Sequence, residues 1–288
     1  MRSSKFLKAA AFTAVLAIGL TACGGDDDDT TTGDATAEPT GDATAEPTGD
    51  DVDTGEFNLV ADGTLTVCTD APYPPMEIED PDSPTGFSGF DIELMGAVAD
   101  NLGLELAVFN SGFDPITTGS AFTAGQCDIA AASITITEER EENIDFTEPY
   151  FTADQSLLVK ADSGITSLAD LAGQTIGAQS GTTGETYANE NAPEGATVQS
   201  FEDPGGLFPA LEADTIQGVL QDIVVNQGRA LEDTTVVVVE TFPTDESYGF
   251  AVAEEGSEAL LDAVNGALAT LQGDGTYDAI YDEWFPTA

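Results

Sequence analysis

The sequence predicts an α/β protein with two lobes joined by a hinge that the chain crosses twice. Short apolar runs typical of buried strands alternate along the chain with amphipathic stretches typical of helices. Two of the strand-like runs, 155–160 and 248–253, mark where the chain leaves the first lobe and returns to it. We therefore assign residues 57–153 and 248–288 to lobe 1 and residues 154–247 to lobe 2. A ligand cleft is expected between the lobes.

The composition is strongly acidic. The 288 residues include 54 Asp and Glu, six Lys and Arg and no His, which gives a net charge of −48. Nucleic acid and anionic lipid are poor partners for such a chain, and the lack of His excludes His-based metal sites and His general bases. We interpret the acidity as adaptation to a saline habitat, where salt screens the repulsion. A general bias toward solubility is the alternative.

The N-terminus has the features of a secretory signal. The first eight residues carry three basic side chains, and residues 9–20 are apolar. The segment ends in the letters LTAC, which resemble a bacterial lipobox, so we predict a signal peptide over 1–22 and lipidation of Cys23. An ordinary cleavage site with a Cys nearby is the alternative. The predicted location is extracytoplasmic, with the protein anchored to the cell membrane by lipid.

Residues 23–56 predict an acidic, disordered tether. They include an eight-residue repeat, TGDATAEP, and Val52 is their only large aliphatic residue, so they cannot bury a core. Loss of the leader would leave three basic residues against 54 acids, a net charge of −51.

Lobe 1 is expected to begin with a strand at 65–68. A loop with three prolines follows and places Asp70 and Tyr73 just past the end of that strand, where open α/β sheets bind ligands. A purely structural turn is the alternative. Asp91 is a good N-cap for the next helix, which Gly103 ends.

The next part of lobe 1 contains a strand at 104–109 and a loop with a short helix that ends at Gly125. A buried strand at 129–132 then leads into hydroxyl residues on alternate positions, Ser133, Thr135 and Thr137.

Arg140 follows this row of hydroxyls, and the helix that Thr137 would cap begins at 138. After the leader, the chain keeps only three basic residues, Arg140, Lys160 and Arg229. We therefore predict that Arg140 binds an anionic group through its two-pronged guanidinium. A salt bridge between Arg140 and a neighbouring acid is the alternative.

Lobe 2 shows two capping-box patterns. The first opens a helix at Ser167 and is followed by a strand at 174–179. The second, Thr182 with Glu185, opens a helix directly after that strand, so its free backbone N–H groups favour an anion. An ordinary helix cap is the alternative.

Further elements of lobe 2 are a helix at 207–211, a buried strand at 216–220 and an apolar strand at 236–239. Asp222 follows the second of these but is one acid among 54, so its position alone does not identify it. After the return to lobe 1, amphipathic helices are expected at 260–271 and 275–285, with the aromatic side chains of the last helix packed in the core.

Five motifs together resemble the amino-acid-binding (family 3) extracellular solute-binding proteins of bacterial ABC importers, over residues 62–285. They are GFDI at 89–92, SITITEER at 133–140, DFTEPY at 145–150, SGTTGE at 180–185 and DGTYD at 274–278. The resemblance implies a two-lobed periplasmic-binding-protein-like fold of type II.

The same resemblance implies a role for individual residues. Arg140, Thr135 and Thr183 would hold the ligand α-carboxylate, and Asp222 and Ser133 the α-ammonium. Tyr73 and Phe113 would sandwich the ligand side chain, while Asp70 and Gln179 face its polar end.

Two residues depart from the family pattern: Met76 replaces the usual Phe, and Ala132 replaces a hydroxyl residue of some cation-binding members. Both bear on the side-chain pocket, so we predict only that the ligand is a polar amino acid.

Cys68 and Cys127 remain after Cys23. Both flank strands of lobe 1 that could be neighbours, and outside the membrane an even pair suggests a disulfide. Two buried thiols are the alternative.

The predicted function is binding and delivery of an amino acid to an ABC transporter permease, as a monomer without cofactor, metal or catalysis. A compatible solute such as ectoine is an alternative ligand. A dehydratase acting on cyclohexadienyl acids and a sensory module without a transporter are the alternative functions.

Overall fold

The structure, a computed structural model, describes residues 57–286. The predicted signal peptide, the lipidation site at Cys23 and the predicted tether lie outside this part of the chain.

Lobe 1 is built on a five-stranded mixed sheet with the order β4-β1-β5-β12-β6. The inner strand β1 (Thr64–Thr69) pairs in parallel with β4 (Glu105–Asn110) and with β5 (Ile129–Ala130). The strand β12 (Ala251–Ala253) runs antiparallel to β5 and to β6 (Ile144–Phe146). The end of β1 therefore lies inside the sheet, as expected for a strand that delivers ligand-binding residues.

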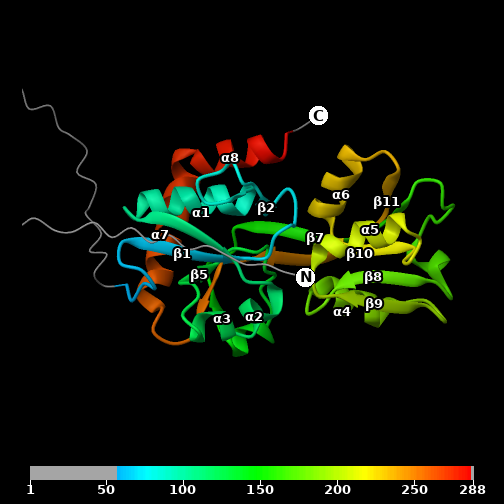
Figure 1. The fold of residues 1–288 in the computed structure, drawn as a ribbon, viewed down its shortest axis with the longest axis horizontal. Coiled ribbons are helices and arrows are strands. Elements are labelled where there is room, and N and C mark those ends of the chain that lie inside the picture. The colour runs from blue at the N-terminus through cyan, green and yellow to red at the C-terminus, as the bar shows by residue number, and fades with distance from the viewer. Residues whose placement is uncertain (1–56, 287–288) are drawn as a thin grey trace, which may run out of the picture. The chain divides into compact units, whose positions relative to one another are not determined.

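Helices cover both faces of this sheet (Figure 1). On one face lie α1 (Phe90–Asn101), α7 (Glu258–Asp274) and α8 (Thr276–Trp284), which enclose the larger hydrophobic core. The short helices α2 (Phe113–Thr117) and α3 (Ser120–Thr123) cover the other face.

A two-stranded hairpin, β2 (Ile78–Glu79) with β3 (Phe87–Ser88), precedes α1. The aromatic side chains of α8 are only partly buried, and Tyr277 and Trp284 pack against the larger core from its edge.

The prediction that Asp91 caps α1 is wrong. The helix begins one residue earlier, at Phe90, with Gly89 in the N-cap position. Gly89 has φ of +117°, and a Cβ there would lie 2.2 Å from the carbonyl oxygen of Met76, so only glycine fits. Asp91 is instead buried and accepts hydrogen bonds from the backbone of Ser133 and the hydroxyl of Tyr150.

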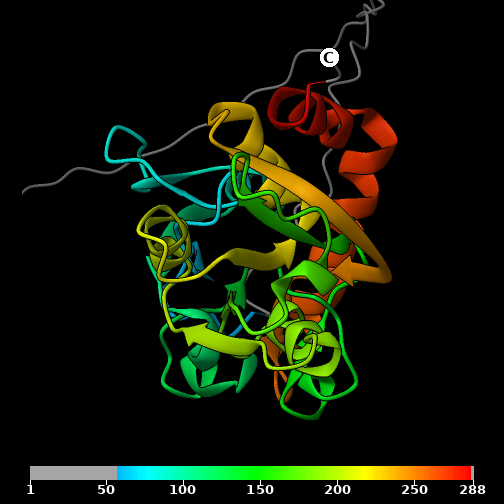
Figure 2. The same cartoon turned by 90° about the vertical axis from the view of Figure 1, so that its right-hand side faces the viewer.

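Lobe 2 has its own five-stranded sheet, with the order β11-β7-β10-β8-β9; Figure 2 views the molecule from the side of this lobe. The strands are β7 (Phe151–Lys160), β8 (Thr175–Gln179), β9 (Thr197–Phe201), β10 (Gly218–Asp222) and β11 (Val236–Tyr248).

The helices of lobe 2 are α4 (Thr183–Asn191), α5 (Leu207–Glu212) and α6 (Ile223–Glu232). Short 3-10 turns lie at Leu168–Leu171 and Pro204–Gly206. Ser167 forms the predicted reciprocal capping box with Asp170 at the first 3-10 turn. The second predicted box is half formed: Thr182 accepts from the backbone N–H of Glu185 and caps α4, whereas the carboxylate of Glu185 accepts from the N–H of Gly181.

The hinge consists of two long antiparallel strands, β7 and β11. Their pairing extends to Phe151 opposite Tyr248, at the boundary with lobe 1. We expected a strand at 236–239 and another at 248–253, whereas β11 runs on for 13 residues and β12 is only three residues long. The polar half of β11 carries no apolar pattern and is held as a strand by pairing with β7.

The helix predicted from 138 is a single 3-10 turn, Arg140–Glu142. The backbone N–H of Arg140 donates to Thr137 Oγ1 at 3.3 Å, as expected of a cap. The chain enters β6 at Ile144, which leaves no room for a longer helix.

Cys68 and Cys127 form a disulfide, with their Cα atoms 5.5 Å apart. Parallel pairing of β1 with β5 brings the two residues together, since Cys68 lies opposite Ala130. The bond lies wholly within lobe 1.

The two-lobed α/β fold is confirmed. Among residues 57–286, no helix is long and apolar enough to span a bilayer.

Candidate functional site

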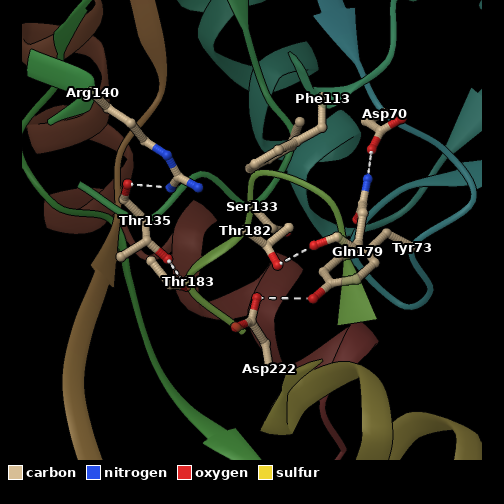
Figure 3. Close-up of a pocket in the computed structure, with 11 residues that line it drawn as sticks. Asp70, Tyr73, Phe113, Ser133, Thr135, Arg140, Gln179, Thr182, Thr183 and Asp222 are labelled. Carbon is tan, nitrogen blue, oxygen red and sulfur yellow. Dashed lines mark hydrogen bonds between the residues drawn. The ribbon is translucent and has the colours of Figure 1, made fainter. Parts of the chain in front are cut away.

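A cavity between the lobes is lined by residues of both (Figure 3). All nine residues predicted to contact a ligand line it, together with Ala132 and Thr182. The cavity is narrow and has room for roughly one water molecule. The side chains of the two lobes therefore fill the cleft and bind one another across it.

Arg140 is the only basic residue of the cavity lining. Its Nη1 donates to the carbonyl of Thr135 at 2.6 Å and its Nη2 to the carbonyl of Gly181, in lobe 2, at 3.1 Å. The guanidinium also lies 4.9 Å from the centre of the Phe113 ring. These contacts fix the group in one orientation.

Among residues 57–286, no carboxylate lies within ion-pair distance of Arg140, whereas Lys160 and Arg229 both form ion pairs. The predicted alternative, a structural salt bridge of Arg140, is therefore not found in this part of the chain. Burial lowers the pKa of Arg140, and the charges of Asp222 and Glu246 act in the opposite direction. An arginine nevertheless stays protonated at neutral pH, so a fixed cation faces the cavity.

Asp222 provides the opposite charge, at the end of β10. The residue is 7% exposed, and its carboxylate accepts hydrogen bonds from the hydroxyls of Tyr73, at 2.9 Å, and Tyr248, at 2.6 Å. Gln155 Nε2 donates to its other oxygen at 2.5 Å. Burial raises the pKa of Asp222 to about 6, although the three hydrogen bonds lower it in part. At neutral pH the site thus holds a desolvated anion.

Ser133 is held by two buried carboxyl groups that the sequence analysis did not select. Its backbone N–H donates to Asp91 at 3.0 Å and its hydroxyl to Glu77 at 2.9 Å. Burial raises the pKa of both acids, and that of Glu77 well above its usual range. These bonds stabilise the positive φ of Ser133, 49°, and leave its carbonyl and hydroxyl oxygens able to accept from a ligand.

The end of the cavity near Asp70 is acidic. Gln179 Nε2, from lobe 2, donates to Asp70 Oδ2 at 2.6 Å. The pKa of Asp70 is raised to about 6. Burial is the main cause, the bond to Gln179 acts in the opposite direction, and the charges of Asp203 and Asp114 contribute to the rise. A positive or hydrogen-bond-donating group would fit this end of the cavity.

Glu246 is a further residue near the cavity that the sequence analysis missed. Its Oε2 accepts hydrogen bonds from the hydroxyl of Thr135, at 2.9 Å, and from that of Thr183, at 2.7 Å. Gln155 Nε2 lies 3.2 Å from the same oxygen. The sequence contains 54 acidic residues, and the segment around Glu246 shows no apolar alternation. No local pattern therefore distinguished Glu246 from the other acids.

No group of three or more Asp, Glu or Cys side chains within residues 57–286 is arranged to hold a metal ion.

The chain belongs to the bacterial extracellular solute-binding proteins, family 3, whose model matches residues 65–287. It is 30% identical over 224 residues to the arginine-binding extracellular protein ArtP of Bacillus subtilis, covering 77% of this chain and 86% of the relative. It is 36% identical over 201 residues to the glutamine-binding protein GlnH of the same organism, covering 68% and 72%.

Among solved structures, an ancestral arginine-binding protein bound to glutamine is 37% identical with a TM-score of 0.72. The match covers 79% of this chain and all of that protein. All three of these relatives are amino-acid-binding proteins, and GlnH is the glutamine-binding protein of an ABC transporter.

Proposed function

We propose that this protein captures a polar amino acid between its lobes and delivers it to an ABC transporter permease. A lipid on Cys23 would hold it at the outer face of the membrane, and it would act as a monomer. The observation that carries the proposal is the presence of a buried cation, Arg140, and a separate buried anion, Asp222, in the lining of the same interlobe cavity. A zwitterionic amino acid presents the two complementary charges.

Each end of the ligand backbone has its own group of residues in this proposal. Arg140, Thr135 and Thr183 bind the α-carboxylate. Asp222 and the oxygens of Ser133 bind the α-ammonium. The aromatic rings of Tyr73 and Phe113 contact the ligand side chain from either side.

The acidic end of the cavity favours a side chain with a positive charge or amide N–H groups. Asp70 and Gln179 bond to each other there, and Asp114 and Asp203 add negative charge. The names of ArtP and GlnH, for arginine and glutamine, agree with this preference. Ectoine fits less well because it has no free ammonium for Asp222. Turnover of a cyclohexadienyl acid is not expected either, because the sequence has no His to act as a general base and Asp222 is assigned to the ligand ammonium.

A thermal-shift screen tests this function. Among the common amino acids, ectoine and betaine, we expect L-arginine, L-lysine or L-glutamine to raise the melting temperature most. At a hundredfold excess over the dissociation constant, binding stabilises the folded state by about 2.7 kcal/mol. The screen is run at low and at molar salt, because the strongly acidic surface needs screening. A shift with ectoine alone, or none with any amino acid, would contradict the proposal.

The pH dependence of binding and that of stability are expected to run in opposite directions. Burial raises the pKa of Asp222 and Asp70 to about 6 from the ordinary value of 3.8. The folded protein therefore takes up protons that the unfolded chain does not, and the resulting stability is complete below the unfolded value and lost as the pH rises through about 6. The ligand-free protein should melt at a higher temperature near pH 5 than at neutral pH.

Binding should weaken over the same interval, because a protonated Asp222 cannot pair with the ligand ammonium. Calorimetric titration with L-arginine and melting of the ligand-free protein, in the same buffers, measure the two effects. The Asp222→Asn variant is the control: its melting temperature should vary less with pH, and its binding should be weak throughout. Affinity that rises on acidification would count against the assignment of Asp222.

A further inference from the structure

Glu246 lies where the proposed function puts the carboxylate of the ligand. Its Oε2 accepts hydrogen bonds from the hydroxyls of Thr135, in lobe 1, and Thr183, in lobe 2. Thr183 Oγ1 also lies 3.4 Å from Thr135 Oγ1, so the two hydroxyls converge on one point of the cleft. A carboxylate of the protein itself thus binds to both hydroxyls assigned to the α-carboxylate.

The strand that carries Glu246 is shaped to direct it there. The pairing of β11 with β7 has a first register shift between Val238 and Glu240. A second shift follows: Phe242 lies opposite Gln155 and Glu246 opposite Ala153, so three residues of β11 face one of β7, which is the signature of a bulge. The bulge is held by Asp154, whose Oδ1 accepts from the backbone N–H of Thr244 at 3.0 Å, and Asp245 adopts a positive φ of 53°. A β-bulge of this kind re-aims the side chain that follows it.

The carboxylate of Glu246 also interacts with Gln155 and, through its charge, with Arg140. Gln155 Nε2 lies within hydrogen-bonding distance of both Asp222 and Glu246, so its amide bridges the two acids. The negative charge of Glu246 also acts on Arg140, second only to that of Asp222. A ligand carboxylate entering the same place would meet a like charge and find both hydroxyls already bonded.

We infer that Glu246 is an internal competitor for the carboxylate subsite, which the α-carboxylate of an incoming amino acid must displace. The inference rests on the proposed function for the identity of the ligand. It assigns Glu246 two effects: it weakens binding of ligands that have an α-carboxylate, and it holds the lobes together when no ligand is bound.

The first test compares affinities by calorimetric titration with L-arginine and L-glutamine. Glu246→Ala should bind the amino acid that binds wild type about tenfold more tightly, because it removes a competing set of charge-assisted hydrogen bonds. Glu246→Gln should gain less, since an amide oxygen still accepts from Thr135 and Thr183. Glu254→Gln removes the same charge at an exposed position and should leave the affinity unchanged. Unchanged or weaker binding by Glu246→Ala would overturn the inference and instead make Glu246 neutral or a ligand contact.

A second probe separates competition from a general effect of charge. Agmatine is arginine without its α-carboxylate, so it has no group that would compete with Glu246 for the hydroxyls of Thr135 and Thr183. Its affinity should not rise in Glu246→Ala. An equal gain for agmatine and arginine would show that only the local field had changed, and the inference would fail.

A third measurement needs no ligand. In small-angle scattering, ligand-free Glu246→Ala should have a larger radius of gyration than wild type, because a contact shared by both lobes is lost. Identical scattering would contradict the inference. Failure of the proposed function would look different, since wild type itself would then bind none of the amino acids.

Discussion

Replacing Arg140 by alanine is expected to abolish amino-acid binding while the protein stays folded. Arg140 is 7% exposed, and truncating one partner of a buried charge pair typically costs about 2–5 kcal/mol, or roughly thirtyfold to several thousandfold in affinity. The loss should fall on binding because the structural contacts of Arg140 go to two backbone carbonyls, those of Thr135 and Gly181. Titration with the best ligand of the screen, together with circular dichroism, measures both properties.

The chain offers a matched control in Arg229. This arginine also pairs with an aromatic ring, Phe208, but forms ion pairs with Glu212 and Asp233 away from the cavity lining. Arg229→Ala should bind normally and lose at most about 1 kcal/mol of stability. Arg140→Lys keeps the charge without the planar fork and should bind with intermediate affinity. If Arg140→Ala binds as wild type does, the carboxylate is held elsewhere and the proposed function loses its main support.

Removing the disulfide should cause the largest loss of stability. Cys68 and Cys127 are separated by 59 residues, and cross-linking a loop of that length stabilises the folded state by about 4 kcal/mol in the chain-entropy model. For a domain of this size, that corresponds to a fall in melting temperature of roughly 8–16 °C. Scanning calorimetry of the Cys68→Ala/Cys127→Ala variant measures the loss.

Ligand binding by the same variant should persist below its melting temperature. The two cysteines do not line the interlobe cavity, and the bond joins segments of lobe 1 only. Wild type treated with a reducing agent should behave like the variant. A melting temperature that neither change lowers would mean that the two thiols do not pair in solution.

The sequence predicted the fold where residue patterns were local. Alternating apolar runs located β1, β4 and β8, and capping residues located α4. The pattern failed where tertiary pairing overrides local preference: the polar end of β11 is a strand because β7 pairs with it. The role of Asp91 was predicted incorrectly. An aspartate that caps a helix and a buried aspartate that binds the backbone of Ser133 cannot be told apart by residue type, because they differ only in their surroundings.

The sequence predicted those residues of the site that belong to a rare residue type or form a visible pattern. Arg140 was conspicuous as one of the three basic residues that follow the predicted leader, and the hydroxyls before it formed a visible row. Asp222 was assigned only through the family resemblance. Glu77 and Glu246 could not be selected among 54 acids, since nothing but their position relative to Ser133 and Thr183 distinguishes them.

The hydrogen bonds that cross the cleft also bear on how quickly a solute can enter. The cavity has room for roughly one water molecule, so an amino acid cannot enter it until the lobes separate. Uptake must therefore wait for a transient parting of Tyr73 from Asp222 and of Asp70 from Gln179. At abundant solute, the internal motion of the protein, rather than diffusion through the medium, would set the upper limit of the association rate.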